Sequence, residues 1–70
     1  MNFLVGDLTL DHEKKPRVRL TFEDGHTLDA TYTDTHGYNH LFLLDNGKII
    51  RLSNYFMHLK GIRVALIEDE

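Results

Sequence analysis

The stretch RVRLTFEDGHTLDATYT, residues 17–33, decides the fold of this chain. Apolar and polar side chains alternate over residues 17–23 and again over residues 27–33, which is the pattern of a strand with one buried face. Between them stands Asp24-Gly25, a hairpin signal because glycine tolerates a positive φ. The stretch therefore predicts two antiparallel strands joined by a tight turn.

Three further strands are expected downstream of this hairpin. Residues 41–44 are all apolar, which is typical of a strand covered on both faces. The run DNG at residues 45–47 predicts a second tight hairpin. Residues 48–53 and 62–67 supply the last two strands, and residues 54–59 between them predict one short helical or 3₁₀ turn.

Five short strands joined by hairpins predict an all-β fold, a small five-stranded antiparallel barrel of SH3-like or Sm-like type. Closure of the barrel would remove the exposed edges of so small a sheet. A chain of 70 residues is expected to form a single domain, and with no cysteine it has no disulfide to stabilise it. We expect residues 1–15 to form an N-terminal strand or a cover, residues 16–67 the barrel, and residues 68–70 an acidic tail.

The charge distribution argues against non-specific DNA binding. Eleven acidic and eight basic residues give a net charge of −3, and the last three residues supply three of the acids. Residues 1–67 are therefore neutral overall, unlike a strong DNA-binding domain. No apolar run is long enough to span a membrane. The N-terminal residues lack the basic start of a signal peptide, so the cytoplasm is the expected location.

Three stretches of the chain resemble parts of the Sm-like family of small β-barrels. Residues 16–30, PRVRLTFEDGHTLDA, resemble the opening of an Sm-like domain, in which a small residue, here Ala30, lets the second strand bend. Residues 38–43, YNHLFL, resemble the end of the first Sm motif, and residues 51–54, RLSN, fall near the second. The pattern covers about residues 16–67. It also resembles the Rho-binding antiterminators, Sm-like regulators that bind a protein rather than RNA.

The resemblance to antiterminators is closest over residues 48–58. It implies a small, non-enzymatic regulatory module that contacts a protein partner in nucleic-acid metabolism or transcription. We expect the contact on the outer face of the first hairpin and on the loop that follows the second strand. The candidate residues are Arg17, Arg19, Thr31, Tyr38 and His40.

A first alternative is an Sm-like protein that binds single-stranded RNA. Flat side chains can stack on bases while an amide or guanidinium group hydrogen-bonds the base edge. The candidates for this role are Tyr38, Asn39, Arg51 and Asn54. Few basic residues are available to neutralise phosphates, so affinity for RNA would be modest and salt-sensitive.

A second alternative is an oligomer-forming structural protein without a ligand. Residues 48–53 and 62–67 are apolar on both faces, whereas a monomeric barrel buries only one face of each strand. Either the apolar residues 3–5 cover the second face, or another chain does. Oligomerisation would then use these two strands.

No residue pattern predicts catalysis, a metal or a cofactor. There is no cysteine, no serine or threonine in a nucleophile elbow, and the five glycines stand alone at turn positions. His36 and His40 have the spacing of two metal ligands on a helix, but Gly37 and the following strand argue against a helix there. We therefore expect a protein that is not an enzyme and that holds no metal or cofactor.

Overall fold

The hairpin expected over residues 17–33 is present in the structure, a computed structural model that describes residues 2–67. β3 (Arg17–Thr21) pairs antiparallel with β4 (Thr27–His36), and Val18 lies opposite Ala30. Both of these side chains are fully buried. The alternation in the sequence therefore gives both the strands and their inward faces.

The second hairpin forms around the DNG turn. β5 (Asn39–Leu44) pairs with β6 (Ile49–Ser53), and Phe42 lies opposite Ile50. Gly47 has a φ of 90°, a conformation that favours glycine and that this turn requires. Both predicted hairpins are thus confirmed.

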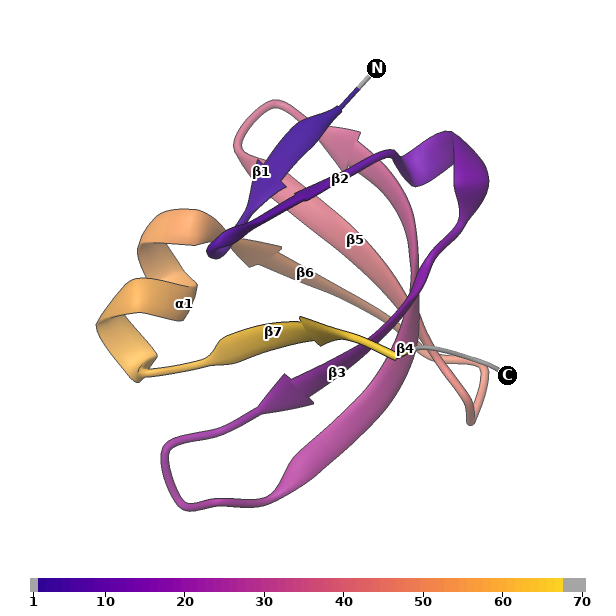
Figure 1. Cartoon of the computed structure of the whole chain (residues 1–70). Coiled ribbons are helices and arrows are strands. Elements are labelled where there is room, and N and C mark those ends of the chain that lie inside the picture. The colour runs from indigo at the N-terminus through magenta and orange to yellow at the C-terminus, as the bar shows by residue number, and fades with distance from the viewer. Residues whose placement is uncertain (1, 68–70) are drawn as a thin grey trace.

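The main sheet has five antiparallel strands in the order β6-β5-β4-β3-β7. The strands from β3 to β6 follow one another along the chain, and β7 (Arg63–Leu66) returns to pair with β3 (Figure 1). The all-β fold class and the count of five strands in the sheet are as predicted.

The expectation of a closed barrel is wrong, because the sheet remains open. β6 and β7 are its two edges, and no ladder joins them. The chain between them forms the helix α1 (Asn54–Lys60), which buries Met57 in the core; Ile62, just before β7, is buried as well. Side chains rather than backbone pairing therefore close the core at this side.

α1 replaces the single turn expected near residues 54–59. The Ser53 side chain accepts a hydrogen bond from the Phe56 amide at 3.0 Å, which caps the start of the helix. Gly61 ends it in the left-handed conformation, at a φ of 67°. The helix begins and ends at the residue types that the sequence offers for these roles.

The N-terminal segment forms a hairpin of its own. β1 (Phe3–Val5) pairs with β2 (Leu8–Leu10) in a separate two-stranded sheet, and the short 3₁₀ helix η1 (His12–Lys14) leads into β3. Val5 and Leu10 are buried against the main sheet. The segment is therefore both a pair of strands and a cover.

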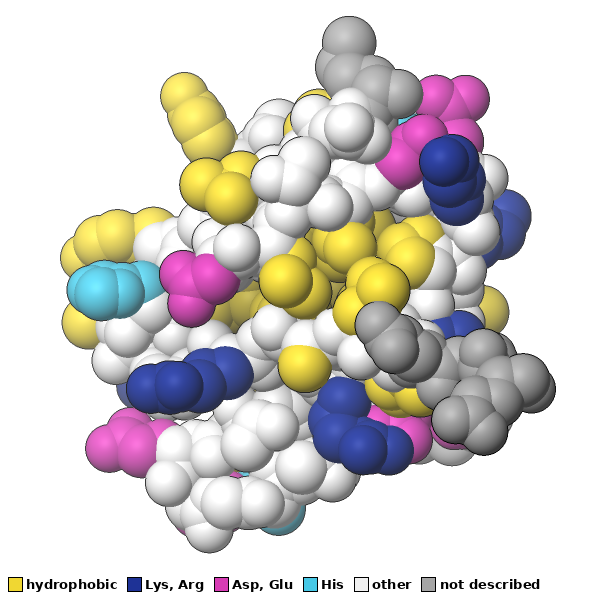
Figure 2. Space-filling model, in the orientation of Figure 1, with side chains coloured by type: hydrophobic (Ala, Val, Ile, Leu, Met, Phe, Trp, Pro, Cys, Tyr) yellow, Lys and Arg dark blue, Asp and Glu magenta, His cyan; other side chains and the backbone are white. Residues whose placement is uncertain are grey.

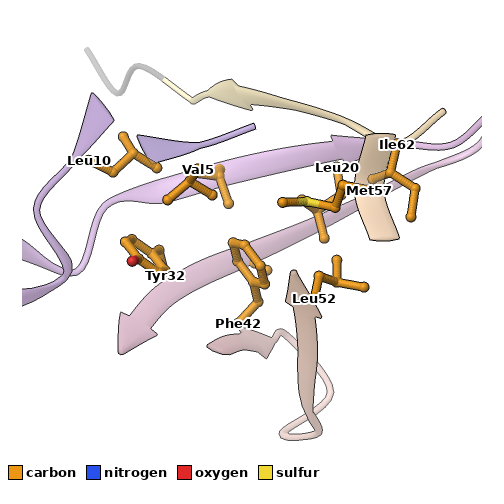
Figure 3. Packing of buried hydrophobic residues seen from close by; sticks show 10 residues of the cluster. Val5, Leu10, Leu20, Tyr32, Phe42, Leu52, Met57 and Ile62 are labelled. Atoms are coloured by element: carbon orange, nitrogen blue, oxygen red, sulfur yellow. The ribbon is translucent and has the colours of Figure 1, made fainter. Parts of the chain in front are cut away.

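One core lies between the main sheet, the N-terminal hairpin and α1 (Figure 3). Every one of these three parts contributes side chains to it. Its members are Val5, Leu10, Val18, Leu20, Ala30, Tyr32, Phe42, Leu52, Met57 and Ile62.

The N-terminal hairpin does not cover the second apolar face of the edge strands. Ile49 on β6 is 63% exposed, and Ala65 on the outer face of β7 is exposed as well. Figure 2 shows hydrophobic side chains at the surface between the two-stranded sheet and β7, where the two sheets are not hydrogen-bonded to each other. The second apolar face expected for these two strands is thus partly exposed.

The expected acidic tail, residues 68–70, lies outside the described residues. Within residues 2–67 no helix has the length and apolar character needed to cross a membrane.

Shortening Met57 tests how much the helix contributes to the core. Met57→Ala should lower the free energy of unfolding by about 2 to 5 kcal/mol, because it leaves a cavity at a site that is 1% exposed. Leu59→Ala is the matched control on the same helix, at 62% exposure, and should change stability by about 0.5 kcal/mol or less. Urea unfolding followed by circular dichroism measures both, and equal losses would contradict this role of Met57.

Candidate binding site

A cleft of about 460 Å³ opens where the N-terminal hairpin meets the β4–β5 turn and the start of α1. We call it the tyrosine cleft. It is lined by Phe3, Leu4, Thr35, Gly37, Tyr38, His40, Ser53, Asn54 and Tyr55. None of these residues is an aspartate, glutamate, lysine or arginine, so the cleft offers apolar surface, hydroxyls and amides.

Two exposed tyrosines stand at this cleft. Tyr38 follows Gly37 in the turn between β4 and β5 and is 91% exposed. Tyr55 lies in the first turn of α1 and is 76% exposed. Neither ring belongs to the core, so most of the surface of each ring is available to a ligand.

Behind the tyrosines, the side chain of Asn54 joins three parts of the molecule. Its Oδ1 accepts a hydrogen bond from the Gly6 amide at 2.8 Å and lies 3.1 Å from His40 Nε2. Its Nδ2 donates to the Leu4 carbonyl at 2.8 Å. Because Oδ1 can only accept, His40 Nε2 carries a hydrogen and donates it.

The other ring nitrogen of His40 faces two hydroxyls. Nδ1 lies 3.0 Å from Thr35 Oγ1 and 3.3 Å from Tyr32 Oη, and these two hydroxyls also contact each other. With the proton on Nε2, Nδ1 of the neutral ring accepts from a hydroxyl. Burial lowers the pKa of His40, although its hydrogen bond to Asn54 opposes this shift. The buried ring is thus held neutral and in one tautomer.

The structure brings some of the predicted site residues together. Tyr38, His40 and Asn54 all line the cleft, and Asn39 is exposed beside them, opposite Ser53 in the β5–β6 ladder. His40 itself is buried, so it positions its neighbours more than it offers a surface. The two loop residues of the predicted protein contact therefore lie at the same site as three of the four residues predicted to contact RNA.

The predicted residues on the first hairpin lie elsewhere. Arg17 forms a bidentate ion pair with Asp45, at 2.8 and 3.3 Å, and also donates to Thr31 Oγ1 at 3.2 Å. Arg19 pairs with Asp29 at 2.8 and 3.1 Å. These contacts lower the pKa of both aspartates. None of Arg17, Arg19 and Thr31 lines the cleft, and both guanidinium groups already have a carboxylate partner.

Arg51, predicted to contact RNA, is also outside the cleft. It lies on β6 opposite Leu41 and is exposed. β6 leads into Asn54 and Tyr55, so Arg51 stands on the strand that runs toward the cleft without lining it.

The sequence interpretation did not select Phe3, Leu4 or Tyr55 for the site. The position of Tyr55 on the helix could have identified it as an exposed residue. Tyr55 precedes the core-facing Met57 by two residues, a rotation of about 200° on a helix, which turns the ring away from the core. Phe3 and Leu4 reach the cleft only through the docking of the N-terminal hairpin, which no local pattern predicts.

Three of the four other histidines lie close to an aspartate. His26 Nδ1 lies 2.6 Å from Asp24, and Asp34 faces both His36 at 2.8 Å and His12 at 3.6 Å. Within residues 2–67 no group of three or more histidine, aspartate or glutamate side chains is arranged to hold a metal ion.

Comparisons of the chain with protein-family models, with curated proteins and with solved structures found no match. The chemistry of the tyrosine cleft and its surroundings is therefore the guide to function.

The lowered pKa of His40 predicts an acid-sensitive fold. Since the folded pKa lies below the ordinary value of 6.5, the unfolded chain takes up a proton first as the pH falls. Stability from the neutral ring is thus complete above pH 6.5 and declines as the pH drops from there through the folded pKa.

Urea unfolding at a series of pH values measures this decline. Subtracting the curve of His40→Gln removes the contributions that the two proteins share, such as that of Asp34. The variant should lose the part of the slope that His40 supplies below about pH 6.5. Parallel curves for the two proteins would show that His40 is not held neutral.

Proposed function

We propose that this protein is a small, non-enzymatic binding module that takes a protein partner in the tyrosine cleft. One observation carries the proposal. Two tyrosines, 91% and 76% exposed, stand at a cleft that contains no charged side chain. Exposed tyrosines that border an apolar hollow are a costly arrangement for a small domain unless a ligand covers them.

Tyrosine suits the contact with a protein. It offers a large apolar ring and a hydroxyl while few rotatable bonds have to be ordered, and tyrosine is enriched among the residues that dominate binding energy. The floor of the cleft is rigid, because Asn54 and His40 hold it through hydrogen bonds to β1 and β4. A preorganised floor reduces the entropy lost on binding.

The distribution of cations favours a protein over single-stranded RNA. RNA binding needs lysine or arginine near the stacked bases to neutralise phosphates. The cleft contains neither residue, and Arg17 and Arg19 are engaged with Asp45 and Asp29. RNA remains the second candidate, supported by the exposed rings of Tyr38 and Tyr55 with Asn39 close by.

The fold supports the resemblance to Sm-like proteins in its general plan. Four consecutive strands form a meander, a short helix follows, and the last strand pairs with the first strand of the meander. A five-stranded barrel of this type has the same elements in the same order, but with its two edge strands paired. The resemblance to Rho-binding antiterminators then suggests a regulatory role in transcription. Fold likeness alone does not fix a function, so the cleft carries the proposal.

Replacing the tyrosines tests the cleft directly. Tyr38→Ala and Tyr55→Ala should each weaken capture of the partner from a lysate by roughly tenfold or more, the usual effect of truncating an aromatic anchor. The capture should survive nuclease treatment. Leu59→Ala, exposed on the same helix as Tyr55 and outside the cleft, is the matched control and should bind as the parent does.

Labelled U-rich and A-rich oligonucleotides supply the competing measurement. If fluorescence anisotropy shows binding that falls with added salt and is lost in Tyr38→Ala, the ligand is RNA and the protein-binding proposal fails. Partner capture that disappears with nuclease would lead to the same conclusion.

A further inference from the structure

β6 is a free edge of the main sheet. Among residues 2–67 it pairs with β5 alone, so in this part of the chain the backbone groups along its other side have no strand partner. Such an edge can accept an extended segment that adds one more strand. β6 spans Ile49–Ser53, long enough for several ladder hydrogen bonds.

The outer face beside this edge combines apolar and cationic side chains. Ile49 is 63% exposed, and Leu43, opposite it on β5, is 37% exposed. Arg51 is exposed on the same face, and Lys48 is exposed at the start of the strand. Ile49 and Arg51 are two residues apart and share this face, so an added strand would meet them with two of its own side chains that are also two positions apart.

The cations on this edge differ from those on the first hairpin. Arg17 and Arg19 are paired with aspartates, whereas within residues 2–67 neither Lys48 nor Arg51 has an ion-pair partner. Their charge is therefore uncompensated where the backbone is also unpaired. An incoming segment with acidic side chains would supply both missing partners.

The edge also leads into the tyrosine cleft. β6 ends at Ser53, and the next two residues, Asn54 and Tyr55, line the cleft together with Ser53. An extended segment lying along β6 thus ends beside residues that line the cleft.

We propose that the β6 edge binds, by β-strand addition, an extended segment of the protein partner that carries an apolar and an acidic residue two positions apart. This inference rests on the proposed function of the tyrosine cleft and names the class of ligand that reaches it. On the outer face the apolar side chain covers Ile49 and Leu43, the acidic one faces Arg51, and the end of the segment approaches the cleft.

A second copy of the chain fits this edge less well. Two β6 edges would bring like charges together, which disfavours pairing. β7 carries Arg63 and, in its described residues, no acid. The acids of Glu68–Glu70 follow it outside the described residues, so self-association is one of the outcomes to be measured.

The probe is a short, end-capped peptide in which a valine and a glutamate stand two positions apart, with threonine between them and a C-terminal tyrosine, labelled for anisotropy. It should bind the full chain with an affinity that falls with salt, and it should shift the amide NMR signals of Ile49 and Arg51. Arg51→Glu should weaken it roughly tenfold, and a peptide with lysine for glutamate should restore binding to that variant. Arg63→Glu, the same charge change on the other edge strand, is the matched control and should leave affinity unchanged.

Strand addition is separated from charge attraction by methylating alternate peptide amides. The methylated peptide should lose binding because it cannot donate to the edge. Binding that survives methylation, or that Arg63→Glu weakens as much as Arg51→Glu, overturns the proposal. So does a mass in solution near twice 8.2 kDa that returns to one chain in Arg51→Glu, since the occupant is then a second copy.

The two proposals fail in different ways. Suppose that Tyr38→Ala and Tyr55→Ala reduce partner capture while Arg51→Glu leaves the affinity for the peptide unchanged. The proposed function of the cleft is then supported and the edge proposal is overturned. If the peptide depends on Arg51 while the tyrosine variants capture the partner fully, the edge binds acidic strands and the proposed function of the cleft is wrong.

Discussion

The side-chain amide of Asn54 is the polar link on which the arrangement of this small domain depends. The N-terminal hairpin shares no ladder with the main sheet, so it is held by the burial of Val5 and Leu10 and by the bonds that Asn54 makes to the Leu4 carbonyl and the Gly6 amide. The same amide orients His40. Ser53 caps α1 one residue earlier, so the start of the helix, the hairpin and the sheet are fixed at a single point.

The open sheet is what leaves this domain with surfaces for a partner. In a closed barrel β6 would pair with β7, and no free edge would remain. Here α1 fills the gap with Met57 and the chain continues to Ile62, which protects the core without pairing the edges. A chain of 70 residues buries a modest share of its surface, so covering such an edge with another chain also stabilises it.

Local signals predicted the parts of the fold that local signals control. Alternation and the two glycine turns place four strands, and Ser53 and Gly61 bound the helix. Closure of the barrel depends on how two distant strands approach each other, and no pattern encodes that. In the site, Tyr38 and Asn54 were selected from their side-chain chemistry. The burial of His40 was hidden because apolar residues surround it on both faces of β5, which obscures the period of two.

The paired state of the arginines shows the same division between local and distant information. Arg19 lies directly opposite Asp29 in the hairpin, so its ion pair follows from the register that the turn imposes. Arg17 meets Asp45 from another hairpin, and only the assembled sheet brings them together. The neutral charge of residues 1–67 therefore conceals an uneven surface, compensated on β3 and β4 and uncompensated on β6. Since exposed charges act over about 10 Å at ordinary ionic strength, this local imbalance rather than the net charge decides which partner the edge attracts.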